Sequence, residues 1–296
     1  MKVAVLGYGT VGAGVYSMLS DAPGMEAGPV LVRPGKAVES FMVSDAALIF
    51  GDPTVDAVVE TLGGLDPAYS YGMRALEAGK HFITANKVMV ASHGLELAAL
   101  AREKGAAFLF SAACGGGVPF LHNLALSAET DRIEAVSGIL NGTTNYMLDA
   151  MQRRGLSYGD ALREAQSLGY AESDPTADVS GLDALRKMQL ACAVAFGVLP
   201  QSGMLCEGME HFTAEDVEDI QSRGLVCRLM ARGSRAGESV SAYVEPVLFP
   251  RAAPESSVFT NNNMARYTGK RCGSIVLMGQ GAGRFPTASA VLRDLA

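Results

Sequence analysis

The chain has 296 residues, which is the length of two domains or of one large domain. Hydrophobic residues make up 49% and charged residues 19% of the sequence, which allows a sizeable core and excludes a disordered chain. The net charge is −7, and the sequence holds neither a basic run nor an unbroken apolar run of about 18 residues, so nucleic acid and membrane are not expected partners.

The first third of the chain alternates short apolar runs with segments of helical pattern. Gly79 and Gly105 stand where two of the helical segments end, as C-terminal capping glycines do. We expect strands at residues 3–6, 30–33, 57–60, 81–84 and 107–110, and helices at 10–19, 45–50, 67–78 and 92–104. Strands that alternate with helices predict an α/β fold, a doubly wound parallel sheet with helices on both faces.

The pattern changes after Ser111, where a glycine-rich stretch at residues 113–119 indicates a hinge. We expect strands at residues 133–140, 225–231, 240–249 and 274–278, and helices at 144–153, 158–167, 181–196, 214–221 and 286–295. This mixture predicts a second α+β domain, and the closing helix follows a glycine-rich turn that could return it to the first domain. The predicted domains are therefore residues 1–115 completed by 280–296, and residues 116–279.

The five cysteines are scattered and odd in number, and no pair has the spacing of metal ligands. The four histidines form no H-x-x-x-H pair, which argues against a catalytic zinc. Free thiols in a reducing compartment are the simplest interpretation, so we expect a cytoplasmic protein.

A glycine-rich turn, GYGTVG, follows the first predicted strand and opens the first predicted helix. In that context Gly7 allows a tight turn, Gly9 lets the backbone approach a pyrophosphate, and Gly12 permits close packing of helix on strand. The amides at the helix N-terminus then face the phosphates. The turn therefore predicts a Rossmann-type dinucleotide site, with a turn that binds nothing as the weaker alternative.

The residue that selects the dinucleotide is expected about 20 residues further on, at the end of the second strand. Arg33 stands there with Lys36 close by, and no Asp or Glu stands at that strand end. Because arginine can bind a 2′-phosphate, we predict NADP(H) over NAD(H). The alternative is that Arg33 is merely solvated.

Three further segments are dense in polar groups. Lys87 closes the TANK segment after a predicted strand, where ligands bind in open α/β sheets, although a lone lysine is more often a surface residue. The Asn141-Gly142 pair is by itself a turn signal. In the third segment Ser180 is a plausible helix N-cap, and Asp183 and Lys187 are four residues apart on one helix face. Pattern alone leaves this pair equally balanced between a buried ion pair and a surface pair.

Several of these motifs together resemble the homoserine dehydrogenase family. The resemblance runs from Met1 to Asp294, and its specific parts are the motifs at residues 59–64 (VETLGG), 79–87, 138–146 (GILNGTTNY), 169–187 and 281–291. It implies the NAD(P)-dependent interconversion of L-homoserine and L-aspartate 4-semialdehyde, the branch step towards threonine and methionine. It also implies a homodimer formed through the second domain.

The resemblance carries catalytic roles to Lys87 and Lys187, with Lys187 as the usual proton donor. It implies that Asp183 orients the substrate and Lys187 with support from Asp178, and that Glu172 holds the substrate amino group. Gly169 would lie in the substrate site and also line the cofactor. The remaining cofactor contacts that it implies are Gly9, Thr10, Val11, Gly63, Ala85 and Gly281. The glycine turn adds Gly7 and Gly12 to this prediction, and Lys87 is also expected to contact the cofactor. Family members also bind a sodium ion through main-chain oxygens, which here match Ser111, Cys114, Gly116 and Val118.

The sequence departs from the family pattern at three places. Ser111 stands where the family usually has Glu, which weakens the case for the sodium ion. Residues 21–45 form a shorter segment than usual, at the ribose end of the cofactor site. Many members continue into a regulatory ACT domain beyond the position of Ala296, so feedback inhibition by threonine through such a domain is not expected.

The implied reaction needs a base during oxidation and an acid during reduction. A lysine ammonium with a pKa of about 10.4 is a poor base at neutral pH. Two lysines on one oxygen would repel each other and burial disfavours charge, whereas Asp183 keeps Lys187 charged, and the sequence does not rank these effects.

Two rival functions are another two-domain Rossmann dehydrogenase of a small amino or sugar alcohol, and a non-catalytic dinucleotide-sensing module.

Overall fold

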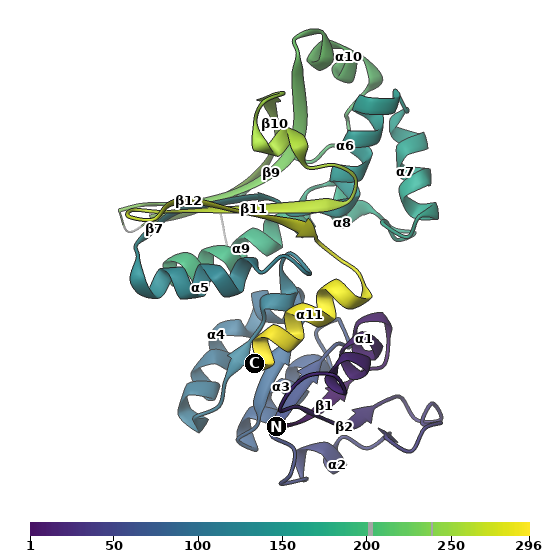
Figure 1. Cartoon of the computed structure of the whole chain (residues 1–296), viewed down its shortest axis with the longest axis vertical. Coiled ribbons are helices and arrows are strands. Elements are labelled where there is room, and N and C mark those ends of the chain that lie inside the picture. The colour runs from purple at the N-terminus through teal and green to yellow at the C-terminus, as the bar shows by residue number, and fades with distance from the viewer. Residues whose placement is uncertain (201–203, 238) are drawn as a thin grey trace. The chain divides into compact units, whose positions relative to one another are not determined.

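The computed structural model describes residues 1–200, 204–237 and 239–296 (Figure 1). These residues form two compact units. The first comprises Met1–Gly117 and Ala282–Ala296, and the second comprises Val118–Gly281. Among the described residues, no helix is both long enough and apolar enough to cross a membrane.

The first unit is built on a six-stranded parallel sheet with the strand order β3-β2-β1-β4-β5-β6. In this order the direction of winding reverses between β1 and β4, as in doubly wound nucleotide-binding sheets. The predicted Rossmann-type fold is therefore confirmed. The strands are β1 (Lys2–Leu6), β2 (Glu26–Leu31), β3 (Met42–Val43), β4 (Ala57–Glu60), β5 (His81–Thr84) and β6 (Phe108–Leu109).

Helices pack on both faces of this sheet. On one face Phe82 of the sheet shares an apolar cluster with Leu97, and on the other Val5 shares a cluster with Val15 and Val291. The last helix, from the far end of the chain, packs beside the first helix. The helices are α1 (Thr10–Leu19), α2 (Ala47–Phe50), α3 (Ala68–Glu77), α4 (Lys87–Lys104), the 3-10 helix η1 (Ser111–Ala113) and α11 (Arg284–Leu295).

The second unit is built on a six-stranded mixed sheet with the order β12-β11-β7-β9-β10-β8. All neighbouring strands are antiparallel except β8 and β10. The strands are β7 (Ile133–Ile139), β8 (Leu205–Cys206), β9 (Leu225–Ala236), β10 (Ser239–Pro250), β11 (Asn262–Gly269) and β12 (Gly273–Gln280).

Helices of the second unit divide between the sheet's two faces. Figure 1 shows α5 and α9 side by side along one face, and α6 on the other side of the sheet. The helices are α5 (Phe120–Thr130), α6 (Gly142–Arg154), α7 (Tyr158–Ser167), α8 (Thr176–Val179), α9 (Leu182–Phe196), α10 (Ala214–Ser222) and the 3-10 helix η2 (Pro254–Ser257).

The structure adds α5 and β11 to the elements expected from the sequence. α5 follows directly on the glycine-rich stretch and buries only Phe120, Leu121 and Leu124, which is too short an apolar pattern to indicate a helix. β11 is an interior strand in which Asn263, Met264 and Ala265 are buried in succession, so it lacks the alternation typical of a strand.

Several predicted boundaries are wrong, and capping explains two of them. α4 begins at Lys87, five residues before the expected start, because the Asn86 side chain accepts a hydrogen bond from the Met89 amide at 3.1 Å. Ser180 does not cap α9: it ends α8, and Gly181, with φ of 82°, is the N-cap. β2 ends at Leu31, so Arg33 lies in the loop beyond the strand rather than at its end.

Candidate active site

The glycine turn of the first unit has the shape that a dinucleotide needs. Gly7 has a φ of 99°, which favours glycine, and a Cβ atom at Gly12 would strike the carbonyl oxygen of Gly7. A Cβ atom at Gly9 would meet no atom within 4 Å, and no side chain caps α1 at this residue. The N-terminus of α1 is therefore open above Gly9, and this arrangement fits a pyrophosphate.

A cavity of about 1070 Å³ begins at this turn and lies within the first unit. Its wall includes Gly7, Gly9 and Gly63, and also both predicted basic residues, Arg33 and Lys36. The long loop between β2 and β3 thus brings the basic side chains to the same cavity as the glycine turn.

One part of the cavity wall differs from what the sequence indicated. Glu39 lines the same cavity as Arg33, although no acidic residue stands at the strand end itself. The loop after β2 folds back, so a carboxylate six residues beyond Arg33 in sequence shares its cavity. The prediction concerned only the strand end, where no Asp or Glu stands; Glu39 reaches the cavity from the loop.

Aromatic rings support the same region. The Tyr16 and Phe41 rings stack with centroids 4.3 Å apart, and the Tyr8 ring lies 5.7 Å from that of Phe41. Tyr8 and Phe41 belong to the cavity wall, so rigid aromatic groups hold the loop that carries Arg33 against α1.

Lys87 is the first residue of α4, at the carboxyl edge of the parallel sheet. Its side chain is partly buried. The buried Asn86 caps the helix at this point and fixes the backbone that carries the lysine. Lys87 thus stands at a fixed helix start, and its catalytic role stays a prediction.

In the second unit, Lys187 and Asp183 form a nearly buried ion pair on α9. The Lys187 Nζ lies 2.7 Å from the Asp183 Oδ2, and the two side chains are only 13% and 9% exposed. Lys187 also donates to the Leu140 carbonyl oxygen at 2.7 Å. Of the two interpretations that the sequence left open, the structure supports the buried pair.

Asn141 connects this ion pair to Asp178. Its Nδ2 donates to the Asp178 Oδ1 at 2.7 Å and to the Asp183 Oδ2 at 2.9 Å. Its Oδ1 accepts from the Thr144 amide at 2.9 Å, which makes Asn141 the N-cap of α6 rather than part of a hairpin turn. The amide nitrogen of this buried residue thus holds the two carboxylates, while its amide oxygen fixes the start of α6.

Asp178 is the group in this cluster with the clearest electrostatic perturbation. Burial raises its pKa above the ordinary value, and the nearby Asp183 carboxylate raises the pKa further, while hydrogen bonds from Asn141 and Thr143 oppose the shift. Thr143 Oγ1 lies 3.2 Å from the Asp178 Oδ2 and donates to the Tyr170 carbonyl oxygen at 2.6 Å. The cluster thus contains one carboxylate paired with a cation and one that resists ionisation.

Asn141 and Thr143 were not predicted as members of this cluster. Their signal was present, because an Asn-Gly pair directly after a strand and before a helical segment also indicates an N-cap. Glu172 and Gly169, by contrast, lie in an exposed loop, where Glu172 contributes its carbonyl oxygen to a bond from Gln166 at 3.1 Å.

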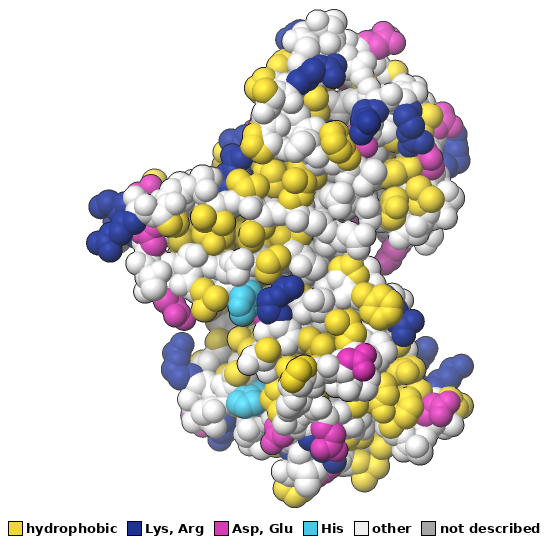
Figure 2. Space-filling view, viewed as in Figure 1, with side chains coloured by type: hydrophobic (Ala, Val, Ile, Leu, Met, Phe, Trp, Pro, Cys, Tyr) yellow, Lys and Arg dark blue, Asp and Glu magenta, His cyan; other side chains and the backbone are white. Residues whose placement is uncertain are grey.

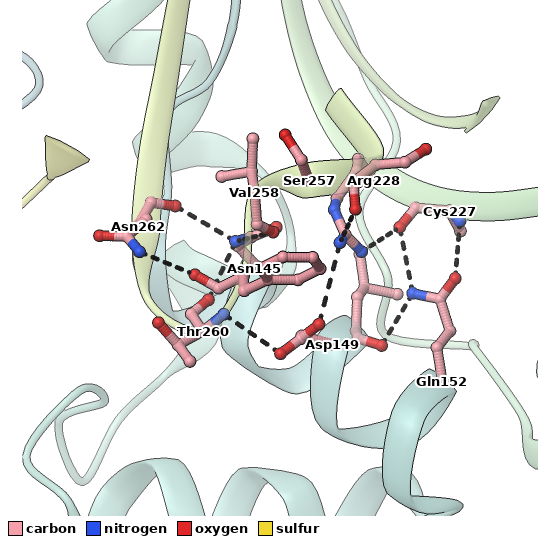
Figure 3. A network of polar contacts seen from close by, with 12 residues as sticks. Asn145, Asp149, Gln152, Cys227, Arg228, Ser257, Val258, Thr260 and Asn262 are labelled. Atoms are coloured by element: carbon pink, nitrogen blue, oxygen red, sulfur yellow. Dashed lines mark hydrogen bonds and ion pairs between the residues drawn. The ribbon is translucent and has the colours of Figure 1, made fainter. Parts of the chain in front are cut away.

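The other side of α6 anchors the helix to the sheet (Figure 3). The Asn145 Nδ2 donates to the carbonyl oxygens of Val258, Thr260 and Asn262 at 3.1, 2.9 and 3.2 Å. The buried Arg228 guanidinium lies 3.9 Å from Asp149, one turn further along α6. One face of α6 is therefore fixed to the segment that leads into β11 and to Arg228 of β9. This anchoring keeps the N-terminus of α6, and with it Asn141, in a defined position.

The predicted sodium ligands lie near the point where the first unit ends. Ser111 begins η1, and its carbonyl oxygen already accepts a hydrogen bond from the Cys114 amide at 3.2 Å. A carbonyl oxygen has a second lone pair, so this bond is compatible with a cation. Among the described residues, no cluster of three acidic, histidine or cysteine side chains could hold a metal. A sodium ion on main-chain oxygens remains a prediction.

Two family models match nearly the whole chain. A model described as the NAD binding domain of homoserine dehydrogenase matches residues 7–111, and one described as homoserine dehydrogenase matches residues 119–296.

Individual relatives agree with these models. The homoserine dehydrogenase of Synechocystis sp. is 37% identical over 319 aligned positions, which span 100% of this chain and 72% of that protein. The enzyme of Bacillus subtilis is 35% identical with the same shares of each chain.

Solved structures give the same result. The crystal structure of a homoserine dehydrogenase from Thiobacillus denitrificans matches with a TM-score of 0.92 and 37% identity over 100% of this chain and 72% of that one. A hyperthermophilic archaeal homoserine dehydrogenase in complex with NADPH shares the fold, with a TM-score of 0.84 at 24% identity over 99% of this chain and 96% of that one. The nucleotide cradle, the buried lysine–aspartate cluster and these matches agree, and the chain belongs to the homoserine dehydrogenase family.

Proposed function

We propose that this chain interconverts L-homoserine and L-aspartate 4-semialdehyde with NADP(H), in the cytoplasm. The observation that carries the proposal is the Lys187–Asp183 ion pair, held by Asn141 in a buried cluster. Such a cluster is costly to fold, because burying charges is favourable only with close partners. A chemical role explains why this fold retains it.

In the proposed reaction Gly7, Gly9 and Gly63 would hold the dinucleotide, which would supply or take up the hydride when bound. Lys187 moves the proton at the substrate hydroxyl oxygen, and Asp183 holds its Nζ in one direction. The contact with Asp183 stabilises the ammonium form, which suits Lys187 to donate a proton when the semialdehyde is reduced. In the oxidation direction the same lysine must first lose its proton, so we expect oxidation to accelerate at alkaline pH.

The remaining substrate groups are assigned from their chemistry. Glu172 is a carboxylate in an exposed loop and would bind the substrate ammonium group. Asp178 would help to position Asp183, because Asn141 donates a hydrogen bond to both carboxylates. Gly169 lies in the same exposed loop as Glu172 and would line the substrate site. Lys87, on the first turn of α4, would polarise the reacting oxygen.

NADP is the proposed cofactor because two cations, Arg33 and Lys36, line the cavity that begins at Gly9. Guanidinium and ammonium groups are the usual partners of a 2′-phosphate. Glu39 in the same wall is the feature that favours NAD, since a carboxylate binds ribose hydroxyls and repels a phosphate.

A homodimer formed through the second unit is also proposed. On β12 the side chains of Val276 and Met278 are 41% and 52% exposed, whereas the alternating Ile275 and Leu277 are half-buried. Figure 2 shows hydrophobic side chains gathered over the region of β11 and β12. Burying these exposed apolar side chains against another protein surface would be favourable. We propose that a second copy of the chain binds to this sheet face.

The direct test is reduction of NADP by the purified chain with L-homoserine at alkaline pH. L-serine, L-threonine and a sugar alcohol serve as controls, because a different dehydrogenase would prefer one of them. Turnover of homoserine well above all controls is expected. NADP binding without turnover of any alcohol would support the dinucleotide-sensing alternative and reject the proposal.

A further inference from the structure

A buried carboxylate in the first unit takes no part in the roles described above. Glu60 ends β4 and is 0% exposed. Three donors point at it: the amides of Leu62 and Gly63 lie 2.6 and 3.2 Å from its Oε1, and the Thr84 hydroxyl lies 2.5 Å from its Oε2. The carboxylate oxygens serve different donors, Oε1 the two amides and Oε2 the hydroxyl.

The two oxygens of Glu60 hold two different turns. The Oε1 side fixes residues 62–64, a turn in which Gly63 and Gly64 both have positive φ and which includes Leu62 and Gly63 of the cofactor cavity. A turn with two adjacent glycines has little conformational preference of its own, so the carboxylate supplies the constraint.

The Oε2 side leads to α4. Thr84 Oγ1, which donates to Glu60, also accepts from the Asn86 amide at 2.9 Å. Asn86 in turn donates from Nδ2 to the Gly64 carbonyl oxygen at 2.6 Å and caps α4 through Oδ1. The bonds close a ring that joins the turn after β4 to the helix start that carries Lys87.

We propose that Glu60 is a positioning residue: its carboxylate sets the cofactor-contacting turn and, through Thr84 and Asn86, the backbone of Lys87. This proposal rests on the proposed function, in which Lys87 acts on the reacting oxygen. Small displacements of reacting groups cost large factors in rate, so a rigid ring between the cofactor turn and Lys87 has a catalytic consequence.

Thr84→Val tests the arm that leads to Lys87, with Thr84→Ser as the matched control that keeps the hydroxyl. In Thr84→Val we expect kcat for homoserine oxidation to fall about 10- to 100-fold, as a displaced catalytic group does. The dissociation constant for NADP should change by less than about threefold, because Oε1 still holds Leu62 and Gly63. Thr84→Ser should keep the wild-type kcat.

Glu60→Gln tests both arms together. A glutamine presents an NH₂ group either to the two turn amides or to Thr84, and so replaces an acceptor with a donor in the same volume. Both kcat and NADP affinity should fall, in contrast to Thr84→Val. If Thr84→Val does not fold, Thr84→Ala removes the same hydroxyl and tests the same arm, and its kcat should fall by a similar factor with NADP affinity retained.

A double-variant comparison separates positioning from simple destabilisation. If Thr84 acts through Lys87, then Lys87→Ala and Lys87→Ala/Thr84→Val should have the same kcat. A further large loss in the double variant, or a wild-type kcat in Thr84→Val, would overturn the inference. Wild-type protein that does not oxidise homoserine at all would instead reject the proposed function, so the two failures are distinguishable.

Discussion

Asp183 and Lys187 face each other across one turn of α9, with 2.7 Å between Oδ2 and Nζ, and Asn141 donates to the same carboxylate oxygen. The lysine is thereby held by a carboxylate on one side and by the Leu140 carbonyl oxygen on the other. These fixed partners hold the ammonium group in one orientation, which is what a proton donor requires.

Lys187→Ala should remove most of kcat while NADPH binding persists. Removing one partner of a buried pair also leaves a buried carboxylate, so the free energy of unfolding should fall by about 3 kcal/mol. Steady-state kinetics, NADPH titration and urea denaturation measure the three quantities. Lys187→Arg is the matched control for charge: it should recover stability but little activity, because arginine does not release its proton. Near-normal turnover in the alanine variant would reject the role of Lys187.

Asp178 gives a prediction about pH. Because its pKa is raised in the folded chain, the folded state keeps the proton while the unfolded state has lost it, so stability falls as pH rises above the ordinary Asp value of 3.8. Asp178→Asn has no proton to lose, and its unfolding free energy should be flatter than that of the wild type from about pH 4 upward. Denaturant titrations across this range provide the test, and parallel curves for the two proteins would contradict it.

The glycine turn supplies a matched pair of variants. Gly12→Ala places a methyl group against the Gly7 carbonyl oxygen, so it should weaken both folding and NADP binding. Gly9→Ala meets open space and a φ of −79°, so it should leave the melting temperature unchanged and weaken only NADP binding. Equal NADP affinity in Gly9→Ala and wild type would show that the cofactor does not approach this residue.

Cofactor preference should depend on Arg33. Arg33→Ala should lower the ratio of kcat/KM for NADP to that for NAD by about 10- to 100-fold, the effect of losing a charged hydrogen-bond partner. Glu39→Ala should raise the ratio, since it removes the carboxylate from the same cavity. A wild-type preference for NAD would overturn the assignment, whatever the variants do.

Dimer formation can be tested by introducing a charged residue into β12. Met278→Asp should convert a dimer of 30.9 kDa chains into monomers in light scattering, because a buried unpaired carboxylate is costly at an apolar interface. Leu95→Asp is the control, since Leu95 on α4 is 64% exposed and belongs to the other unit. A wild-type chain that is monomeric at all concentrations would reject the dimer.

The amino-acid sequence by itself determined the parts that depend on neighbours along the chain. The glycine turn, the strands β1, β4 and β5, and the spacing of Asp183 and Lys187 are local patterns of fixed period, so they could be predicted with their function. The specific motifs also placed the chain in its family.

Only the tertiary structure decided the features that depend on contacts between segments far apart in the sequence. The burial of the Asp183–Lys187 pair, the bonds from Asn141 to carboxylates about 40 residues away, the presence of Glu39 beside Arg33 and the ring around Glu60 all depend on how loops close over strands. A hydrogen bond or a shared cavity between remote residues leaves no periodic pattern in the sequence from which it could be predicted. The environment of each chemical group was therefore set by the fold, while its identity was set by the sequence.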